Sequence, residues 1–121
     1  PRRARQRGRI IIISSSAGTA GNPGAGPYGA AKAGVIGLAK GLARELLPSE
    51  ITVNCIAPSM AMTDLLDGMS AGYIADKKSR IPMGRLCTPE EIADVAAFIA
   101  SPACSFTPGQ VFDVTGGRAT W

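Results

Sequence analysis

The 121-residue sequence contains no histidine. This absence excludes a serine–histidine–aspartate triad and every metal centre that is ligated by histidine. The three cysteines, Cys55, Cys87 and Cys104, are odd in number, far apart and without a CxxC spacing, which argues against a disulfide framework and against a zinc site. We therefore expect no bound metal and reduced thiols in a cytoplasmic protein. Any acid–base chemistry then falls to tyrosine, lysine, serine and carboxylate groups.

Long hydrophobic runs are also missing, since no stretch of eighteen apolar residues occurs. Nothing in the sequence is therefore expected to span a membrane. A hydrophobic content of 45% with 18% charged residues is typical of a globular chain, and 121 residues suffice for one modest domain.

The formal net charge of +4 comes mainly from the first nine residues. That segment carries Arg2, Arg3, Arg5, Arg7 and Arg9. A basic arm can bind nucleic acid, but no aromatic residue is interleaved here and no recognition motif follows. We expect no nucleic-acid partner, and we interpret residues 1–9 as a basic lead-in that is either the end of a preceding helix or a truncation artefact.

The remaining sequence alternates between strand and helix patterns. We expect strands at 10–13, 51–57 and 110–115, a loop over 16–27, a helix over 28–47, two short helices within 64–80, and a helix after the capping box Thr88-Pro89-Glu90-Glu91. This order predicts an α/β fold with right-handed crossovers. The run of isoleucines at 10–13 is typical of an interior parallel strand that is covered on both faces.

Tyr28 and Lys32 form the first chemically suggestive pair. They are separated by four residues at the start of the predicted helix, so both side chains lie on one helix face. A nearby ammonium group favours the phenolate and lowers the pKa of the phenol, which fits Tyr28 for general acid or base work. A surface tyrosine and lysine on a helix would show the same spacing.

Ser15 adds a third polar group to this pair. It follows the apolar strand directly, and ligands of open α/β sheets gather at the carboxyl ends of the strands. Ser15 would therefore present its hydroxyl where a substrate binds.

Four motifs in this order resemble the C-terminal half of a short-chain dehydrogenase/reductase, and most closely its 3-oxoacyl-[acyl-carrier-protein] reductase-like members. They are Ser15 with Tyr28 and Lys32, PYGAAKAGVIGLAKGLARE at 27–45, ITVNCIAPSMAMTD at 51–64, and GQVFDVTGG at 109–117. The resemblance implies a doubly wound parallel sheet of the Rossmann type. Residues 10–121 would form its catalytic half, and the nucleotide-binding half with its glycine-rich turn has no counterpart here.

The resemblance also implies roles for individual residues. Tyr28 would exchange a proton with a carbonyl or alcohol oxygen, Ser15 would donate a hydrogen bond to it, and Lys32 would hold the nicotinamide ribose. The positions that would bind the cofactor are Tyr28, Lys32, Pro58, Ser59, Ala61 and Thr63. Ser59 stands where the family usually has glycine, so its Cβ must avoid a positive φ.

We therefore predict an oxidoreductase that interconverts a carbonyl and a secondary alcohol with NAD or NADP, the choice between the two being open. The family implies a homo-oligomer, a dimer or a tetramer. In the family the helix over 28–47 packs on the sheet and also in a subunit interface. It carries a flat strip of small residues against which a sheet or another helix can approach, namely Ala30, Ala33, Gly34, Gly37 and Gly41. The alternative is a truncated, inactive remnant that at most associates with intact subunits.

Overall fold

The computed structural model of the protein describes residues 7–120. Its centre is a three-stranded parallel sheet in the order β1-β2-β3. The strands are β1 (Gly8–Ile13), β2 (Ile51–Pro58) and β3 (Val111–Val114). The pairing sets Ile10 opposite Val53 and Cys55 opposite Val111. Because all three strands are parallel, their carboxyl ends meet at one edge of the sheet.

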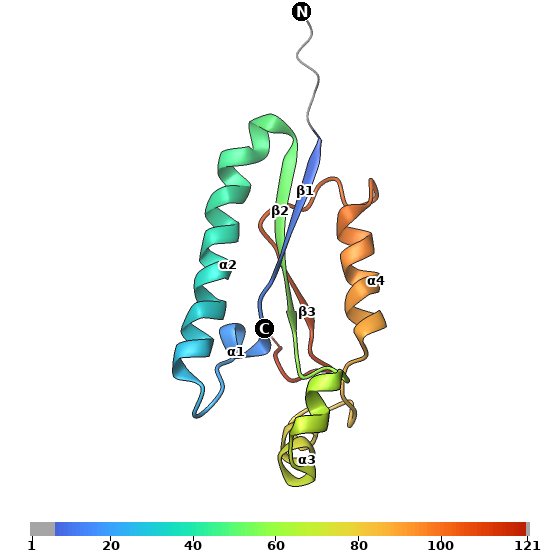
Figure 1. Cartoon of the computed structure of the whole chain (residues 1–121). Coiled ribbons are helices and arrows are strands. Elements are labelled where there is room, and N and C mark those ends of the chain that lie inside the picture. The colour runs from blue at the N-terminus through green and yellow to red at the C-terminus, as the bar shows by residue number, and fades with distance from the viewer. Residues whose placement is uncertain (1–6, 121) are drawn as a thin grey trace, which may run out of the picture.

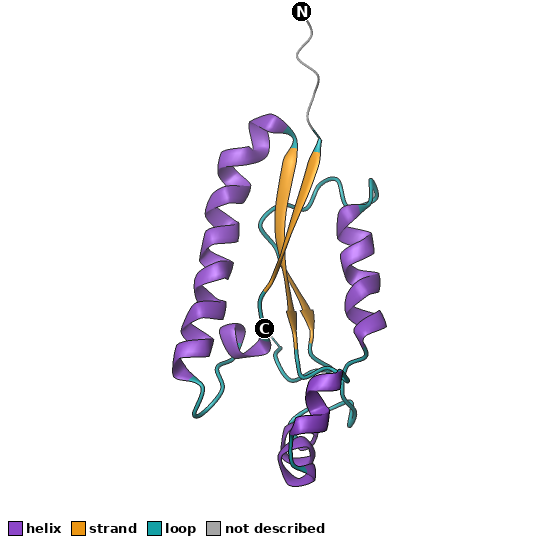
Figure 2. Ribbon diagram, in the orientation of Figure 1, coloured by secondary structure: helices purple, strands orange, loops and turns teal. Residues whose placement is uncertain are grey.

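Helices cover both faces of this sheet. They are α1 (Ser16–Thr19), α2 (Gly26–Leu46), η1 (Leu47–Ser49), η2 (Asp64–Gly68), α3 (Ala71–Ser79) and α4 (Pro89–Ala100). Figure 1 shows α2 on one face and α4 on the other, while α1, the start of α2 and α3 gather where the strands end. The layers coloured by secondary structure in Figure 2 confirm the predicted α/β class.

The core lies between α2 and the middle of β2. Ala39 and Ala43 on the helix pack against Val53 and Cys55 on the strand, and all four are almost completely buried. Alanine has a short side chain, so the helix lies close to the sheet along this line. Larger apolar residues surround the contact, namely Ile12, Ile36, Leu42, Leu46 and Val111. Full burial of a side chain such as Val53 stabilises the fold by about 1.5–3 kcal/mol.

The environment of β1 differs from the expected interior strand. Within residues 7–120, β1 pairs only with β2, and β2 is the central strand. Ile10 and Ile13 remain 39% and 47% exposed. An isoleucine run predicts burial on both faces, but burial of a strand also requires neighbouring elements, and the described chain supplies them only for β2.

The strip of small residues on α2 is also placed differently from our expectation. A Cβ atom added at Gly34, Gly37 or Gly41 would meet nothing within 4 Å. These residues are exposed, and so are Ala30 and Ala33. The strip therefore does not pack on the sheet, which Ala39 and Ala43 contact instead, and an approach by another helix stays a prediction.

Several strands and helices begin a few residues away from their predicted positions. The strand predicted at 10–13 begins at Gly8, which takes two residues from the basic lead-in; residues 1–6 lie outside the described part. The predicted loop over 16–27 contains the short helix α1, and α2 begins at Gly26 rather than at Tyr28. The two short helices within 64–80 and the capping box at Thr88 are confirmed. No helix within residues 7–120 is long and apolar enough to cross a membrane.

Candidate functional site

The junction of β1, α1 and α2 positions the predicted catalytic residues. Ser14 directly follows β1, and there its backbone N–H donates to the Ile56 carbonyl at 2.7 Å and its hydroxyl donates to the Lys32 carbonyl at 2.7 Å. Gly18 on α1 lies so close to α2 that an added Cβ would stand 2.6 Å from the Lys32 carbonyl carbon. The first turns of α2 are thus held against the end of β1 by buried contacts.

Tyr28 and Lys32 lie together, as their spacing predicted. The Lys32 ammonium nitrogen is 5.7 Å from the centre of the Tyr28 ring and donates to the Ile13 carbonyl at 3.0 Å. Tyr28 is 52% exposed, so its phenol is open to solvent beside the carboxyl end of β1. A cation and an accessible phenol therefore lie side by side at this edge of the sheet.

Ser15 caps α1. Its backbone is extended, and its hydroxyl oxygen accepts a hydrogen bond from the Ala17 backbone N–H at 3.1 Å. The hydroxyl hydrogen of Ser15 stays available to donate to another group. Since α1 packs on α2 near Lys32, Ser15 lies at the same edge of the sheet as Tyr28.

β2 ends with Pro58 at this edge, and Ser59 follows it. Ser59 is 8% exposed, its backbone N–H donates to the Val114 carbonyl at 3.1 Å, and its buried hydroxyl has no hydrogen-bond partner among the described residues. A buried polar atom without a partner is costly and calls for a ligand or water. The only non-glycine residue with positive φ in residues 7–120 is Glu50, so Ser59 meets the backbone constraint that its Cβ imposes.

Ala61 and Thr63 follow on a segment that is anchored at one side. Ala61 forms an isolated parallel bridge with Cys87. The Met62 backbone N–H donates to the Cys87 carbonyl at 2.8 Å. Thr63 is exposed and precedes η2 without capping it through its side chain. The backbone of this segment is fixed, while the Thr63 hydroxyl faces outward.

The start of α4 carries an ion pair and a hydrogen-bonded carboxylate. Arg85 and Glu91 form a two-pronged ion pair, and the Thr88 backbone N–H donates to the Glu91 carboxylate at 2.9 Å. The hydrogen bond from Arg85, followed by that from Thr88, lowers the pKa of Glu91 to about 2. Burial raises the pKa of the adjacent Cys87 thiol, with the Glu91 charge as a further cause, so this cysteine is held as a thiol.

Two hollows lie at opposite ends of the sheet. The larger, about 710 Å³, lies at the amino ends and is lined by residues such as Arg9, Glu50 and Thr52. The smaller, about 290 Å³, lies at the carboxyl ends and is lined by Ser59 and Thr115 among others. We place the functional site at the carboxyl ends although the larger hollow is elsewhere, because parallel sheets bind ligands there and Tyr28, Lys32 and Ser15 lie at that edge.

Sequence reasoning missed three residues at the same edge. The Asn22 side-chain oxygen accepts hydrogen bonds from Lys77 at 3.3 Å and from Arg118 at 3.4 Å. Asn22 precedes α2, Lys77 lies on α3 and Arg118 follows β3. No local sequence pattern joins positions that are 55 and 96 residues apart. The only signal in the sequence was that each of these residues belongs to a segment near the carboxyl ends of the strands.

The carboxyl edge fits the nicotinamide end of a dinucleotide. The ammonium group of Lys32 can donate to ribose hydroxyl groups, and the unpartnered Ser59 hydroxyl and the fixed backbone at Ala61 can meet a carboxamide. The fit covers that end of the cofactor alone.

Comparison with known proteins gives a consistent result. The family described as enoyl-(acyl carrier protein) reductase matches residues 1–119. The chain is 43% identical over 114 residues to the 2-dehydro-3-deoxy-L-rhamnonate dehydrogenase (NAD(+)) of a Sphingomonas species. This alignment covers 94% of the present chain and 46% of that protein. It is 46% identical over 112 residues to the 3-oxoacyl-[acyl-carrier-protein] reductase of Chlamydia muridarum, covering 93% and 45%.

Solved structures agree with these sequence matches. The 3-oxoacyl-[acyl-carrier-protein] reductase of Brucella melitensis superposes with a TM-score of 0.85 at 40% identity, over 92% of this chain and 42% of that one. A 3-ketoacyl-(acyl-carrier-protein) reductase from the same species, complexed with NADH, gives a TM-score of 0.84 at 35% identity, over 93% and 44%. The chain spans about half the length of the relatives it matches.

Proposed function

This chain belongs to the short-chain dehydrogenase/reductase family, and from that premise we propose that it forms the catalytic half of an NAD(P)-dependent oxidoreductase that interconverts a carbonyl and a secondary alcohol. The observation that carries the proposal is the placement of Lys32 beside the open phenol of Tyr28 at the carboxyl edge of the sheet. Similarity of fold alone would not define a reaction, and the proposal is supported further by a cation, a phenol and a serine at one edge of the sheet.

In this proposal Tyr28 moves the proton. Its hydroxyl donates a proton to the carbonyl oxygen during reduction and takes it back during oxidation, while the Ser15 hydroxyl donates a hydrogen bond to the same oxygen. Lys32 holds the ribose from its position beside the Tyr28 ring. A bound nicotinamide supplies or accepts the hydride.

The segment after β2 completes the cofactor site in this proposal. Pro58 and Ser59 border the nicotinamide, the backbone at Ala61 meets its carboxamide, and Thr63 contacts the pyrophosphate. Both NAD and NADP fit these contacts, because none of them reaches the adenosine ribose that distinguishes the two. The substrate is a small carbonyl compound or alcohol, and the setting is the cytoplasm.

The family implies a homo-oligomer. The complete protein would be a homodimer or homotetramer with α2 in its interface, where the exposed strip of small residues permits close approach. The alternative is that the chain is an inactive remnant that at most associates with intact subunits. Titration of the protein with NADH and NADPH, followed by cofactor fluorescence, separates these readings: a remnant would not alter the fluorescence.

The decisive experiment on the reaction is Tyr28→Phe. We expect turnover to fall by about 10²-fold or more while the circular dichroism spectrum and the unfolding midpoint stay unchanged, because only the acid–base group is removed. Retained turnover would sink the proposal.

Lys32→Met with its matched control Lys40→Met tests the role of the cation. Both lysines lie on α2 and both donate to a main-chain carbonyl, of Ile13 and Gly109 respectively, at 3.0 and 3.1 Å. Only Lys32→Met should raise the KM for the cofactor and lower kcat. Equal effects of the two substitutions would mean that the loss is structural.

A further inference from the structure

The amide oxygen of Asn22 has two cationic partners. Lys77 donates to it at 3.3 Å and Arg118 at 3.4 Å, so two positive groups converge on one neutral oxygen. Neither forms an ion pair with a carboxylate among residues 7–120, where the ion pairs are Arg7–Glu50, Arg80–Asp76 and Arg85–Glu91. The Lys77–Asn22–Arg118 cluster therefore holds two cations without a direct carboxylate partner among residues 7–120.

Burial makes this arrangement unusual. Lys77 is only 8% exposed, and its ammonium nitrogen lies 5.1 Å from the centre of the Tyr73 ring. A buried lysine is normally paired with an acid, because the loss of hydration of the charge is costly without one. A ring and an amide oxygen compensate for part of that cost, and an anion would compensate for much more.

The two cations are held by a rigid support. The Asp113 carboxylate accepts a hydrogen bond from the Thr115 hydroxyl at 2.6 Å, which fixes the turn that carries Arg118. The same turn packs on the chain just after α3, where a Cβ at Gly116 would stand 2.7 Å from Ile81 and the Met83 backbone N–H donates to the Gly116 carbonyl at 3.0 Å. The elements that carry Lys77 and Arg118 are thus tied to each other.

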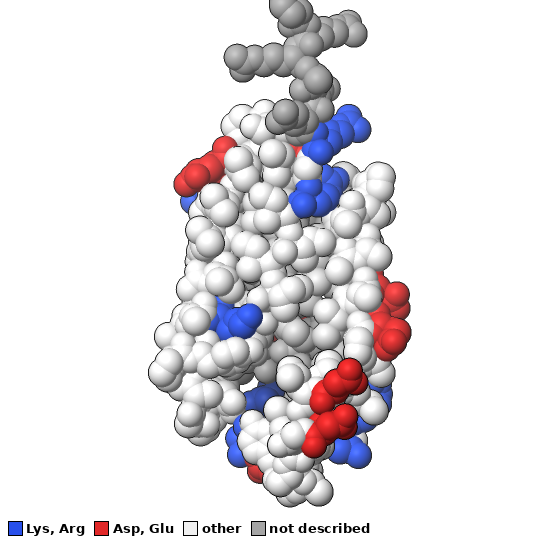
Figure 3. Space-filling model, viewed as in Figure 1, with Lys and Arg blue, Asp and Glu red and all other residues white. Residues whose placement is uncertain are grey.

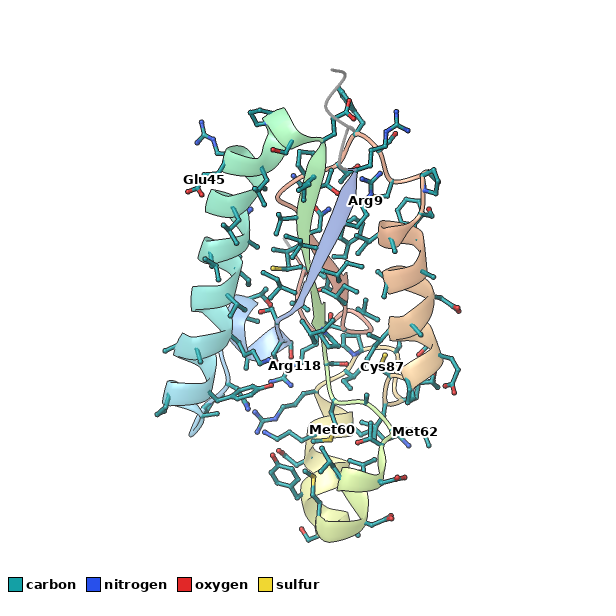
Figure 4. All side chains as sticks on the ribbon, turned by 45° about the horizontal axis from the view of Figure 1, so that its top comes forward. Arg9, Glu45, Met60, Met62, Cys87 and Arg118 are labelled. Carbon is teal, nitrogen blue, oxygen red and sulfur yellow. The ribbon has the colours of Figure 1, made fainter. Side chains whose placement is uncertain are left out.

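The cluster lies beside the proposed reaction centre. Asn22 accepts the Ala25 backbone N–H through its carbonyl at 3.1 Å, in the turn that leads into α2 and to Tyr28. Figure 4 places Arg118 between the end of α1 and α3. Figure 3 shows basic surface in the recess between the lower end of α2 and α3, with acidic groups on the neighbouring surface. A group bound there would reach the carboxyl edge of the sheet.

We propose that Lys77 and Arg118, on either side of Asn22, bind an anionic oxygen group, a carboxylate or a phosphate, of the carbonyl substrate. The assignment of this anion to the substrate rests on the proposed function. The guanidinium group of Arg118 matches the planar oxygens of such a group, and Lys77 supplies a second charge-assisted hydrogen bond. The cluster would thereby select acidic substrates over neutral ones and place their carbonyl carbon toward Tyr28.

The test uses the protein without any cofactor. Its ¹H–¹⁵N spectrum is titrated with 2-oxobutyrate, with methyl phosphate and with the neutral 2-oxobutyramide at constant ionic strength. We expect at least one anion to bind and to shift the signals of Asn22, Lys77 and Gly116 to Arg118, and the amide to bind about tenfold more weakly or not at all. The ratio of the two anion affinities identifies carboxylate or phosphate as the preferred group.

Matched variants assign the effect to the cluster. Lys77→Gln should weaken anion binding about tenfold, whereas Lys78→Gln removes the same charge from the exposed neighbour on α3 and should change it less than twofold. Arg118→Gln gives an independent test if Lys77→Gln disturbs folding, and Lys77→Arg should retain most of the affinity.

Equal binding of the anions and the amide would overturn the proposal, as would equal losses for Lys77→Gln and Lys78→Gln. Signal shifts confined to another part of the chain would do so as well. This titration needs no turnover, so its failure is distinct from failure of the proposed function. If the Tyr28→Phe variant kept its turnover, the proposed reaction would be contradicted, but the evidence for anion binding at Lys77 and Arg118 would remain.

Discussion

The helices α2 and α4 flank the same sheet but are stabilised in opposite ways. α4 is preceded by Thr88, whose hydroxyl accepts the Glu91 backbone N–H at 3.2 Å while the Glu91 carboxylate accepts the Thr88 backbone N–H. The residue before α2, Ala25, provides no side-chain cap. Several interior glycines weaken α2 further, since each costs up to about 1 kcal/mol relative to alanine.

The difference follows the positions of the functional residues. The first turns of α2 carry Tyr28 and Lys32, and tertiary contacts from Ser14 and Gly18 hold them in place. The first turn of α4 carries no residue of the proposed site and is stabilised by its own neighbours in sequence. A helix that presents reactive groups at its start thus depends on the rest of the fold, while a supporting helix can be stabilised locally.

The largest expected effect is on the contact that holds α2. Gly18→Ala would place a Cβ 2.6 Å from the backbone of Lys32, and backbone cannot move aside as a flexible side chain can. We expect a loss of about 2–3 kcal/mol in the free energy of unfolding, measured by urea denaturation. Gly26→Ala, where an added Cβ has open space, is the control. Unchanged stability of Gly18→Ala would show that α1 does not brace α2.

A smaller loss is expected when the local stabilisation of α4 is removed. Thr88→Ala deletes the hydroxyl that caps the helix and should cost about 1 kcal/mol. Thr88→Ser keeps a capping hydroxyl and should cost much less. If Thr88→Ala were as stable as the unchanged protein, α4 would depend on tertiary packing as α2 does.

The pH dependence of stability should report on the same helix start. Glu91 has a pKa of about 2 in the folded protein against an ordinary value of 4.5, so its ionised form stabilises the fold above pH 4.5. That contribution is lost as the pH falls from 4.5 toward 2, when the folded protein must take up the proton. Urea denaturation at several pH values should show a shallower decline for Glu91→Gln than for the unchanged protein; parallel curves would contradict the assignment.

The smallest effect is a gain on the exposed face of α2. Gly37→Ala adds a methyl group where nothing lies within 4 Å, so it should stabilise the protein by up to about 1 kcal/mol. A loss of stability that grows with protein concentration would instead mean that another copy packs on this strip, as proposed for the homo-oligomer. Sedimentation of the variant alongside the unchanged protein distinguishes the two.

The sequence determined the features that depend on near neighbours. The capping box at Thr88 and the shared face of Tyr28 and Lys32 each lie within one helical turn, so local geometry suffices to predict them. The strand after Glu50 is confirmed because a run of apolar and β-branched residues is typical of a buried strand. The helix α1 was missed because its four residues, SAGT, read as a turn.

Tertiary structure decided the rest. Only the fold shows that β2 is central and β1 exposed, because the same apolar pattern suits either position until neighbours are placed. Only the fold joins Lys77 and Arg118 at Asn22, across 55 and 96 residues. The physical reason is the parallel sheet itself: it brings the ends of distant strands to one edge, and a residue's partners there depend on topology rather than on its neighbours in sequence.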